Sequence, residues 1–184
     1  LLPGHNLIFD LDTESLTVTP YYKPEMTVNE SLSYQDAADE FRDLLTDSVR
    51  LRLRSDVPVG SCLSGGLDSS SIVCVIHNLL AQQGQPGSQH TFSSHFEEKE
   101  ANELEYMHEV IQATSVEPHF IYPTPNDLLQ DLKQLIWHQE EPFGSTSIFA
   151  QWSVFKLVHE NGIKVMLDGQ GADEMLAGYI PLSS

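Results

Sequence analysis

Between residues 57 and 167 the chain alternates short apolar runs with longer segments in which apolar residues recur with the period of a helix. Such an alternation predicts a parallel sheet with helices on both faces, because the chain must cross back through a helix before each new strand. We therefore expect an α/β fold with a doubly wound parallel sheet. Strands are predicted over residues 57–63, 90–96, 117–122 and 163–167, and helices over 70–83, 102–114 and 148–160.

Two further helix starts are indicated by capping patterns. Ser33-x-x-Asp36 and Thr124-Pro125-Asn126-Asp127 have the spacing of a capping box, in which each end of the first helical turn bonds to the backbone of the other. Pro125 suits the first helical position, where its missing N–H is not needed. The first pattern precedes an amphipathic segment, and the second precedes a leucine-rich one.

The first 26 residues have a different pattern. Two short β-prone runs, Asn6 to Asp10 and Leu16 to Thr19, are separated by the polar sequence Asp12-Thr13-Glu14, which predicts a hairpin. A two-stranded hairpin alone is marginally stable in water. This segment is therefore either packed on the main domain or the edge of a sheet that lies elsewhere.

The charge of the chain disfavours several classes of partner. Its 184 residues include 27 acidic and 9 basic side chains, for a formal net charge of -18. Duplex nucleic acid and anionic membranes are bound by basic faces, so neither is expected as a main partner. The two cysteines cannot build a disulfide framework, no apolar run reaches about 18 residues, and no signal peptide is visible, so we expect a cytoplasmic protein. The eight histidines lack metal-binding spacing and are interpreted as ordinary packed or surface residues.

A glycine- and serine-rich loop, Ser64-Gly65-Gly66-Leu67-Asp68-Ser69-Ser70, joins an apolar strand to an apolar helix. A helix N-terminus offers unpaired N–H groups to an anion, and glycines let the backbone approach it closely. Asp68 would repel a bare phosphate, but Mg²⁺ binds carboxylates and phosphates together. The loop therefore predicts a magnesium-bound nucleotide. It lacks the lysine of the Gly-x-x-x-x-Gly-Lys-Ser/Thr loop, and the alternative is a turn that merely caps a helix.

A second loop, Asp168-Gly169-Gln170-Gly171-Ala172-Asp173-Glu174, follows the last predicted strand and is also rich in glycine and acid. The carboxyl ends of parallel strands share one edge of the sheet, where ligands bind. Both loops should open onto that edge and hold Mg-pyrophosphate from two sides. Taken alone, the second loop also fits a turn with solvated acids.

These residues carry a family resemblance. The first loop resembles the pyrophosphate loop of the ATP-pyrophosphatase (PP-loop), or adenine nucleotide α-hydrolase-like, superfamily. Together with Asp168 to Tyr179 and Glu141-Pro142-Phe143, it resembles the synthetase domain of the glutamine-hydrolysing asparagine synthetase family, from about Tyr34 to Tyr179. Residues 1–26 are similar to the tail of the glutaminase domain that precedes it. The resemblance thus implies two domains, residues 1–26 and residues 27–184, the second truncated at its C-terminus.

The resemblance implies an amide-forming ligase that uses ATP and Mg²⁺. The aspartate side chain would attack the α-phosphate of ATP, giving β-aspartyl-AMP and pyrophosphate, and ammonia from a glutaminase domain would displace AMP to give asparagine; a homodimer is possible. Asp68 and Asp173 would bind Mg²⁺. The residues that would hold the pyrophosphate are Ser64, Gly65, Gly66, Asp68, Ser69 and Ser70. The adenosine would be bordered by Cys62, Leu63 and Ser94. Asp168 and Gly169 would contact the nucleotide from the second loop.

Departures from the family pattern leave alternatives open. The family more often has Ser-Gly-Glu-Gly-Ser-Asp-Glu at the second loop, so Gln170 replaces a glutamate that could act as a base or hold ammonium. The family's catalytic lysine would lie beyond Ser184 and its N-terminal cysteine is absent, so we expect a fragment that binds Mg-ATP weakly without turnover. The alternatives are another PP-loop amide or β-lactam-type synthetase with a different acceptor, a tRNA-modifying PP-loop enzyme, which the charge disfavours, and a non-catalytic nucleotide-binding module.

Overall fold

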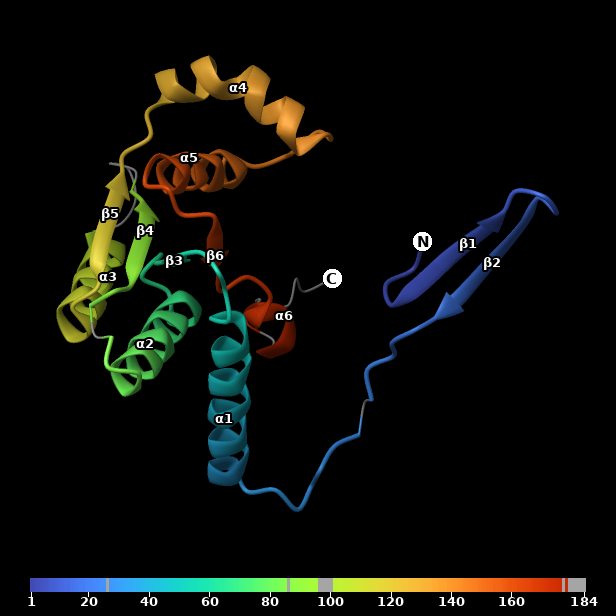
Figure 1. Ribbon diagram of the computed structural model, residues 1–184, viewed down its shortest axis with the longest axis horizontal. Helices are drawn as coiled ribbons and strands as arrows, with labels where there is room; N and C mark the ends of the chain where they lie inside the picture. The colour runs from blue at the N-terminus through green and yellow to red at the C-terminus, as the bar shows by residue number, and fades with distance from the viewer. Residues whose placement is uncertain (26, 86, 96–100, 177, 179–184) are drawn as a thin grey trace, which may run out of the picture. The chain divides into compact units, whose positions relative to one another are not determined.

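A parallel four-stranded sheet is the centre of the computed structural model, which describes residues 1–25, 27–85, 87–95, 101–176 and 178 (Figure 1). The strands lie in the order β5-β4-β3-β6, and every neighbouring pair is parallel. This confirms the α/β fold with a parallel sheet. The strands are β3 (Val59–Cys62), β4 (His90–Ser94), β5 (Glu117–Ile121) and β6 (Val165–Leu167).

Each strand lies within its predicted range but is shorter, for reasons visible in the backbone. β3 begins only at Val59, because Pro58 has no N–H to give to the ladder. β6 begins at Val165, because the N–H of Ile163 donates instead to the carbonyl of Val158 and closes the end of the preceding helix, with Gly162 at a φ of 72°. Of the predicted strand 90–96, Phe96 lies outside the described residues.

Helices pack on both faces of the sheet. On one face, α2 (Leu67–Gln82) and α3 (Ala101–Thr114) meet the sheet around Leu63, Val73 and Met107. On the other, α5 (Ser147–Glu160) packs against Phe92 of β4 through Val154 and Val158. The alternation of side chains along each strand assigns residues to these faces.

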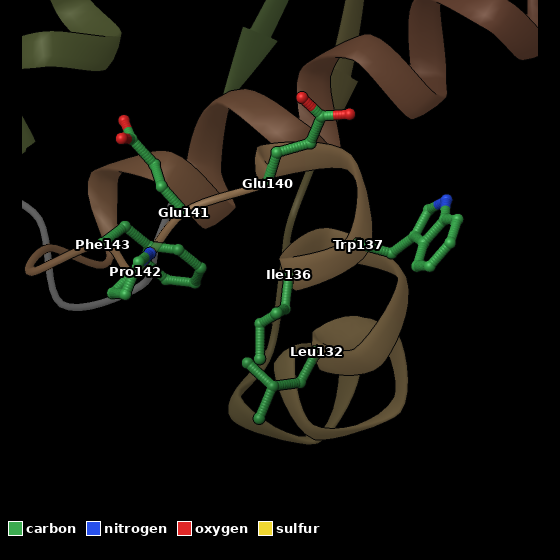
Figure 2. A pocket seen from close by; sticks show the side chains of 7 residues that line it. All are labelled: Leu132, Ile136, Trp137, Glu140, Glu141, Pro142 and Phe143. Carbon is green, nitrogen blue, oxygen red and sulfur yellow. The ribbon is translucent and has the colours of Figure 1, made fainter.

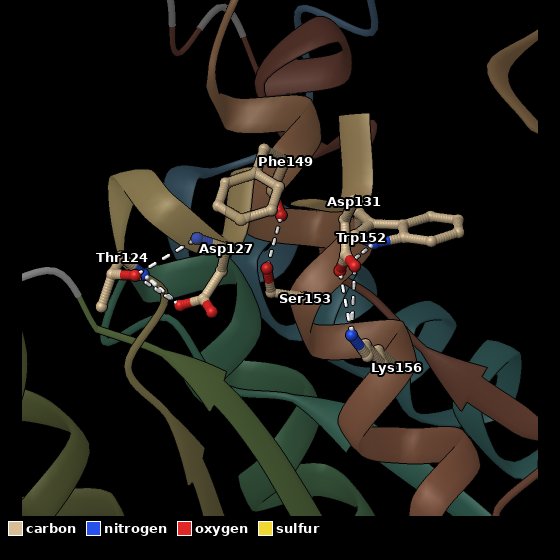
Figure 3. Close-up of polar contacts among 7 residues, drawn as sticks. All are labelled: Thr124, Asp127, Asp131, Phe149, Trp152, Ser153 and Lys156. Carbon is tan, nitrogen blue, oxygen red and sulfur yellow. Dashed lines mark hydrogen bonds and ion pairs between the residues drawn. The ribbon is translucent and has the colours of Figure 1, made fainter. Parts of the chain in front are cut away.

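Polar contacts fix α4 (Pro125–Gln139) at its start and against α5 (Figure 3). Thr124 and Asp127 form the predicted capping box, with Pro125 in the first turn. Asp131 on α4 accepts hydrogen bonds from Trp152 Nε1 at 3.0 Å and from Lys156 Nζ at 3.0 Å on α5. One carboxylate thus ties the two helices together.

The N-terminal part contains the predicted hairpin, formed by β1 (His5–Asp10) and β2 (Ser15–Pro20), which pair antiparallel. In the turn, Asp10 accepts hydrogen bonds from the N–H groups of Thr13 and Asp12, and these bonds, chiefly those with Thr13, lower the pKa of its carboxyl. The chain divides into two compact units, residues 1–41 and residues 42–184.

The long helix α1 (Tyr34–Arg52) crosses the boundary between these units. At its start the N–H of Asp36 donates to Ser33 Oγ, and the Ser33 hydroxyl donates to the Asp36 carboxylate, which is a variant of the predicted box. Its C-terminal half packs with α2 through Val49 and Ile76. Within the described ranges, no helix combines the length and apolarity that crossing a bilayer requires. The remaining helix is α6 (Ala172–Leu176).

Candidate functional site

The loop between β3 and α2 is shaped by two adjacent glycines. Gly65 has a φ of 84°, and a Cβ placed on it would lie 2.6 Å from the backbone oxygen of Glu103. Gly66 is the N-cap of α2, with an extended backbone and no capping side chain. Only glycine combines this conformation with this close approach at position 65.

The helix begins earlier than predicted. α2 starts at Leu67 rather than near Ser70. Gly66 is the last residue with an extended backbone, so the helix begins directly after it. Asp68 and Ser69 therefore lie in the first helical turn instead of in a loop. The first N–H groups of a helix have no partner within it. The carboxylate of Asp68 and these N–H groups consequently meet at the same place, which suits a metal-bound phosphate better than a bare one.

The serine hydroxyls hold the loop in this shape. Ser69 is buried, and its Oγ accepts from the N–H of Ser64 at 3.1 Å, lies 2.9 Å from Ser64 Oγ, and donates to the carbonyl of Gly66 at 3.2 Å. Ser70 donates its N–H to the Gly66 carbonyl as the first regular helical bond. The two hydroxyls at positions 64 and 69 thus fix the backbone of the loop, and they accept the N–H groups of Ser64 and Gly66.

The second loop contacts the first. A Cβ placed on Gly169 would lie 3.0 Å from the Cβ of Asp68 and 3.1 Å from the nitrogen of Ser69, so this glycine packs on the first turn of α2. This contact follows from the pairing of β3 with β6, which brings their carboxyl ends side by side. The structure therefore brings together the two loops that the sequence separates by about a hundred residues.

Asp168, which follows β6, also raises the pKa of Cys62 on the neighbouring strand β3. Burial, then the negative charge of Asp168 and a hydrogen bond to it, raise the pKa of the Cys62 thiol to about 12. The thiol is therefore a neutral donor to the Asp168 carboxylate, not a nucleophile. Asp168 is itself exposed and accepts the N–H of Gly169.

A small cavity of about 90 Å³ opens beside these loops, between the ends of β3 and β4. Cys62, Leu63 and Ser94, which are the residues expected to border an adenosine, all lie on its wall. The remaining lining residues are Ser64, Phe92, Ser93, Glu103, Met107 and Val154.

The two expected magnesium ligands occupy equivalent positions. Asp68 lies in the first turn of α2, which follows β3, and Asp173 lies in the first turn of α6, which follows β6. Both carboxylates are half-buried. Since β3 and β6 are neighbours in a parallel pair, both helices begin at the same edge of the sheet. Tyr179, the end of the resembling segment, lies outside the described residues.

From its sequence context, His95, which lies at this edge, is interpreted as an ordinary packed or surface histidine. His95 follows β4 directly, is 9% exposed, and donates its backbone N–H to Ile121. Within the described part of the chain its Nδ1 has no hydrogen-bond partner, and its ring meets that of Tyr122 edge to face. A polar atom buried without a partner is a candidate ligand-binding group. The only signal in the sequence was its place just after a strand.

A separate pocket lies at the C-terminal end of α4 (Figure 2). It has a volume of about 830 Å³ and is lined by Leu132, Ile136, Trp137, Glu140, Glu141, Pro142 and Phe143, with Trp137 pointing away from Leu132 and Ile136. No residue of either glycine-rich loop lines it. Three of its residues are the Glu141-Pro142-Phe143 segment of the sequence resemblance.

Known proteins resemble this chain in fold and in sequence. The structure of glutamine-dependent NAD⁺ synthetase from Acinetobacter baumannii in complex with ADP matches with a TM-score of 0.56 at 17% identity, covering 96% of this chain and 32% of that one. Asparagine synthetase (glutamine-hydrolyzing) 1 from Bacillus subtilis is 35% identical over 86% of this chain and 23% of its own length. Amidase chyE from Penicillium rubens is 29% identical over 97% and 28% respectively.

The parallel sheet and its likeness to the NAD⁺ synthetase show an α/β protein with the adenine nucleotide α-hydrolase-like fold. The model of the asparagine synthase family matches residues 40–183, so most of the chain is covered. The chain belongs to the asparagine synthase family. It spans about a third or less of the length of the curated relatives that it matches.

Proposed function

We propose that this chain is the nucleotide-binding part of an ATP-dependent ligase that forms an amide from a carboxylate, with aspartate as the acceptor. The observation that carries the proposal is the contact between the two acidic glycine-rich loops, at Gly169 and Asp68, at the carboxyl edge of the sheet. Membership of the asparagine synthase family supports the reaction class.

The residues present fit a magnesium-bound nucleotide. Gly65 lets the loop pass close against the backbone of Glu103, and α2, with the N–H groups of its first turn, begins directly after Gly66. Asp68 and Asp173 supply the one or two carboxylates that Mg²⁺ takes in nucleotide sites. When bound, Mg²⁺ neutralises charge on the phosphate oxygens. Cys62, Leu63 and Ser94 would border the adenosine, and Asp168 and Gly169 would contact the nucleotide from the second loop.

The proposed reaction has two steps. The acceptor carboxylate attacks the α-phosphorus of ATP, and the bond to pyrophosphate breaks while α2 and the first loop hold the leaving pyrophosphate. Ammonia then attacks the acyl carbon, AMP leaves, and the nitrogen loses a proton. We propose that a glutaminase domain of the same protein supplies the ammonia. The fixed N–H groups stabilise charge without reorganising, which is where most of the rate enhancement would arise.

Gln170 favours a second candidate, a ligase of the same class with a different acceptor. An amide at this position donates and accepts hydrogen bonds but cannot take up a proton as a carboxylate does. Gln170 is exposed at the second loop, where it would face the acceptor or the ammonia. The likeness to a protein named as an amidase, chyE, is compatible with this alternative.

Asp68→Asn tests the nucleotide site. We expect the full-length variant to bind Mg-ATP about tenfold more weakly or worse, because a charged metal ligand is lost, while its affinity for metal-free AMP is unchanged. Calorimetric titration measures both. Asp43→Asn, an exposed acid on α1, is the matched control. An equal loss for both ligands would assign Asp68 a structural role and remove the magnesium site.

Release of pyrophosphate identifies the acceptor. With ATP, Mg²⁺ and ammonium, the full-length protein should release pyrophosphate only when aspartate is added. Release that depends on another carboxylate would select the second candidate. Tight nucleotide binding with no release for any carboxylate would reject the ligase and leave a binding module.

A further inference from the structure

Three metal-ligating side chains meet at the amino ends of two strands, away from the nucleotide loops. His90 Nδ1 lies 3.1 Å from His119 Nε2 and 3.5 Å from Glu117 Oε2, and His119 Nε2 lies 3.7 Å from Glu117 Oε1. Among the described residues, His90, Glu117 and His119 form the cluster of three possible ligands whose donor atoms all lie within 4.8 Å of one another.

The strand register produces this cluster. His90 is opposite Glu117, and Phe92 is opposite His119, in the parallel pairing of β4 with β5. Residues two apart on a strand share a face, so all three side chains lie on the face covered by α5. All four strands are parallel, and the two glycine-rich loops follow the carboxyl ends of β3 and β6, so the cluster and the loops lie at opposite ends of the strands.

The spacing of the three donor atoms matches a tetrahedral metal. Zn²⁺ binds nitrogen and oxygen at about 2.0–2.1 Å, which places two tetrahedral ligands about 3.3 Å apart. The two imidazole nitrogens lie 3.1 Å apart, and each lies 3.5 or 3.7 Å from one or the other oxygen of the Glu117 carboxylate, close to that value. Two imidazoles and one carboxylate are also a donor set that zinc takes with one position left for water.

Packing holds the imidazoles in place before a metal arrives. The ring of His119 stacks on the buried ring of Phe92, with centroids 4.7 Å apart and an angle of 12°, and the ring of His90 stacks on His119 at 5.4 Å. Glu117, by contrast, is 61% exposed. A bound ion would therefore be fixed by the two histidines, capped by an exposed carboxylate and reached from solvent, while the net charge of -18 favours any cation.

From these contacts we infer that His90, Glu117 and His119 bind one divalent transition-metal ion of the zinc type, which joins the edge strand β5 to β4. The fourth position is left to water. Because the ligands come from two strands, the ion acts as a clip on the sheet edge. Mg²⁺, which prefers oxygen ligands, does not replace it.

Metal titration of the full-length protein, first treated with a chelator, tests the inference. We expect one equivalent of Zn²⁺ to bind, Co²⁺ to give the visible absorption of a tetrahedral complex, and Zn²⁺ but not Mg²⁺ to raise the melting temperature. His90→Ala and Glu117→Gln should each bind Zn²⁺ at least about tenfold more weakly, since each removes one of three ligands. His159→Ala, on the exposed side of α5, should bind it unchanged.

Glu117→Gln keeps the inference testable if a histidine variant fails to fold, because its exposed side chain retains its shape and loses only its charge. Unchanged Zn²⁺ affinity in Glu117→Gln and His90→Ala, or the absence of a zinc-dependent shift in the wild type, would overturn the inference. The trio would then be a hydrogen-bonded group only. ATP binding plays no part in these measurements, so they are independent of the proposed ligase activity.

Discussion

At the scale of single residues, Cys62 reports on the contact between β3 and the second loop. Its thiol is largely buried and lies against the carboxylate of Asp168, and both effects raise the thiol pKa, to about 12. Cys74 has a pKa that is raised by burial alone. The two cysteines therefore differ in depth of burial and in the influence of Asp168, and Cys74, which lacks that neighbour's influence, serves as an internal reference.

Asp168→Asn should speed the alkylation of Cys62 at pH 8 by roughly two- to tenfold, since a one-unit fall in pKa raises the thiolate fraction about tenfold. The increase is limited because burial, the larger cause, remains. Mass spectrometry after timed exposure to iodoacetamide measures the rate at each cysteine. The rate at Cys74 should not change, and a matching increase there would point to general loosening of the fold instead.

Gly65 combines a left-handed backbone with a crowded position. Gly65→Ala should lower the free energy of unfolding by about 2 kcal/mol or more, because alanine is strained at this φ and its Cβ would press on the carbonyl of Glu103. Urea unfolding measures the loss. Gly84→Ala is the matched control, since Gly84 has a similar φ of 74° with nothing within 4 Å. Equal losses in the two variants would mean that the contact with Glu103 adds nothing.

At the scale of elements, the polar contact between α4 and α5 depends on Asp131. Trp152 and then Lys156 hydrogen-bond to its carboxylate, and these contacts lower its pKa (Figure 3). A carboxyl whose pKa is lower in the folded state stabilises the fold above its unfolded pKa of about 3.9. That stabilisation is lost as the pH falls through the folded pKa.

Asp131→Asn should therefore cost about 1 kcal/mol of unfolding free energy at pH 7, the usual range for a partly exposed ion pair with hydrogen bonds. The difference between variant and wild type should shrink as the pH falls from 5 towards 3. Urea unfolding across this pH range measures it. Asp43→Asn serves as the control, and a difference that stays constant with pH would show that the ionised carboxylate is not what stabilises the contact.

Local chemistry explains which elements were predictable. The capping box at Thr124 and Asp127 satisfies its own helix end, so its sequence spacing was sufficient to place α4. The starts of β3 and α2 were wrong by a few residues. Pro58 removes a ladder bond, and Gly66 caps a helix without any capping side chain, so neither boundary interrupts the apolar pattern. Helix and strand boundaries that depend on backbone hydrogen bonding are thus harder to predict from the sequence than those that depend on capping side chains.

At the scale of the whole molecule, the sheet order decides which distant residues meet. The two loops could be expected together, because carboxyl ends of parallel strands share an edge. The cluster of His90, Glu117 and His119 could not, since it depends on which strands are neighbours and on their register. The spacing of residues within one strand or helix contains no information about which strands are neighbours or about their register. The same limit applies to the contact of Cys62 with Asp168, which spans β3 and β6.

The pairing of β3 with β6 also sets the order in which the sheet is completed during synthesis. Val59 pairs with Val165, so β3 leaves the ribosome roughly 5–20 seconds before its partner at about 5–20 residues per second. During that interval, β3 can pair with β4, but its other edge is open to strands of other chains. The contact between the two glycine-rich loops therefore forms only after β6 has paired with β3, and we expect the nascent chain to be most prone to aggregate just before that pairing.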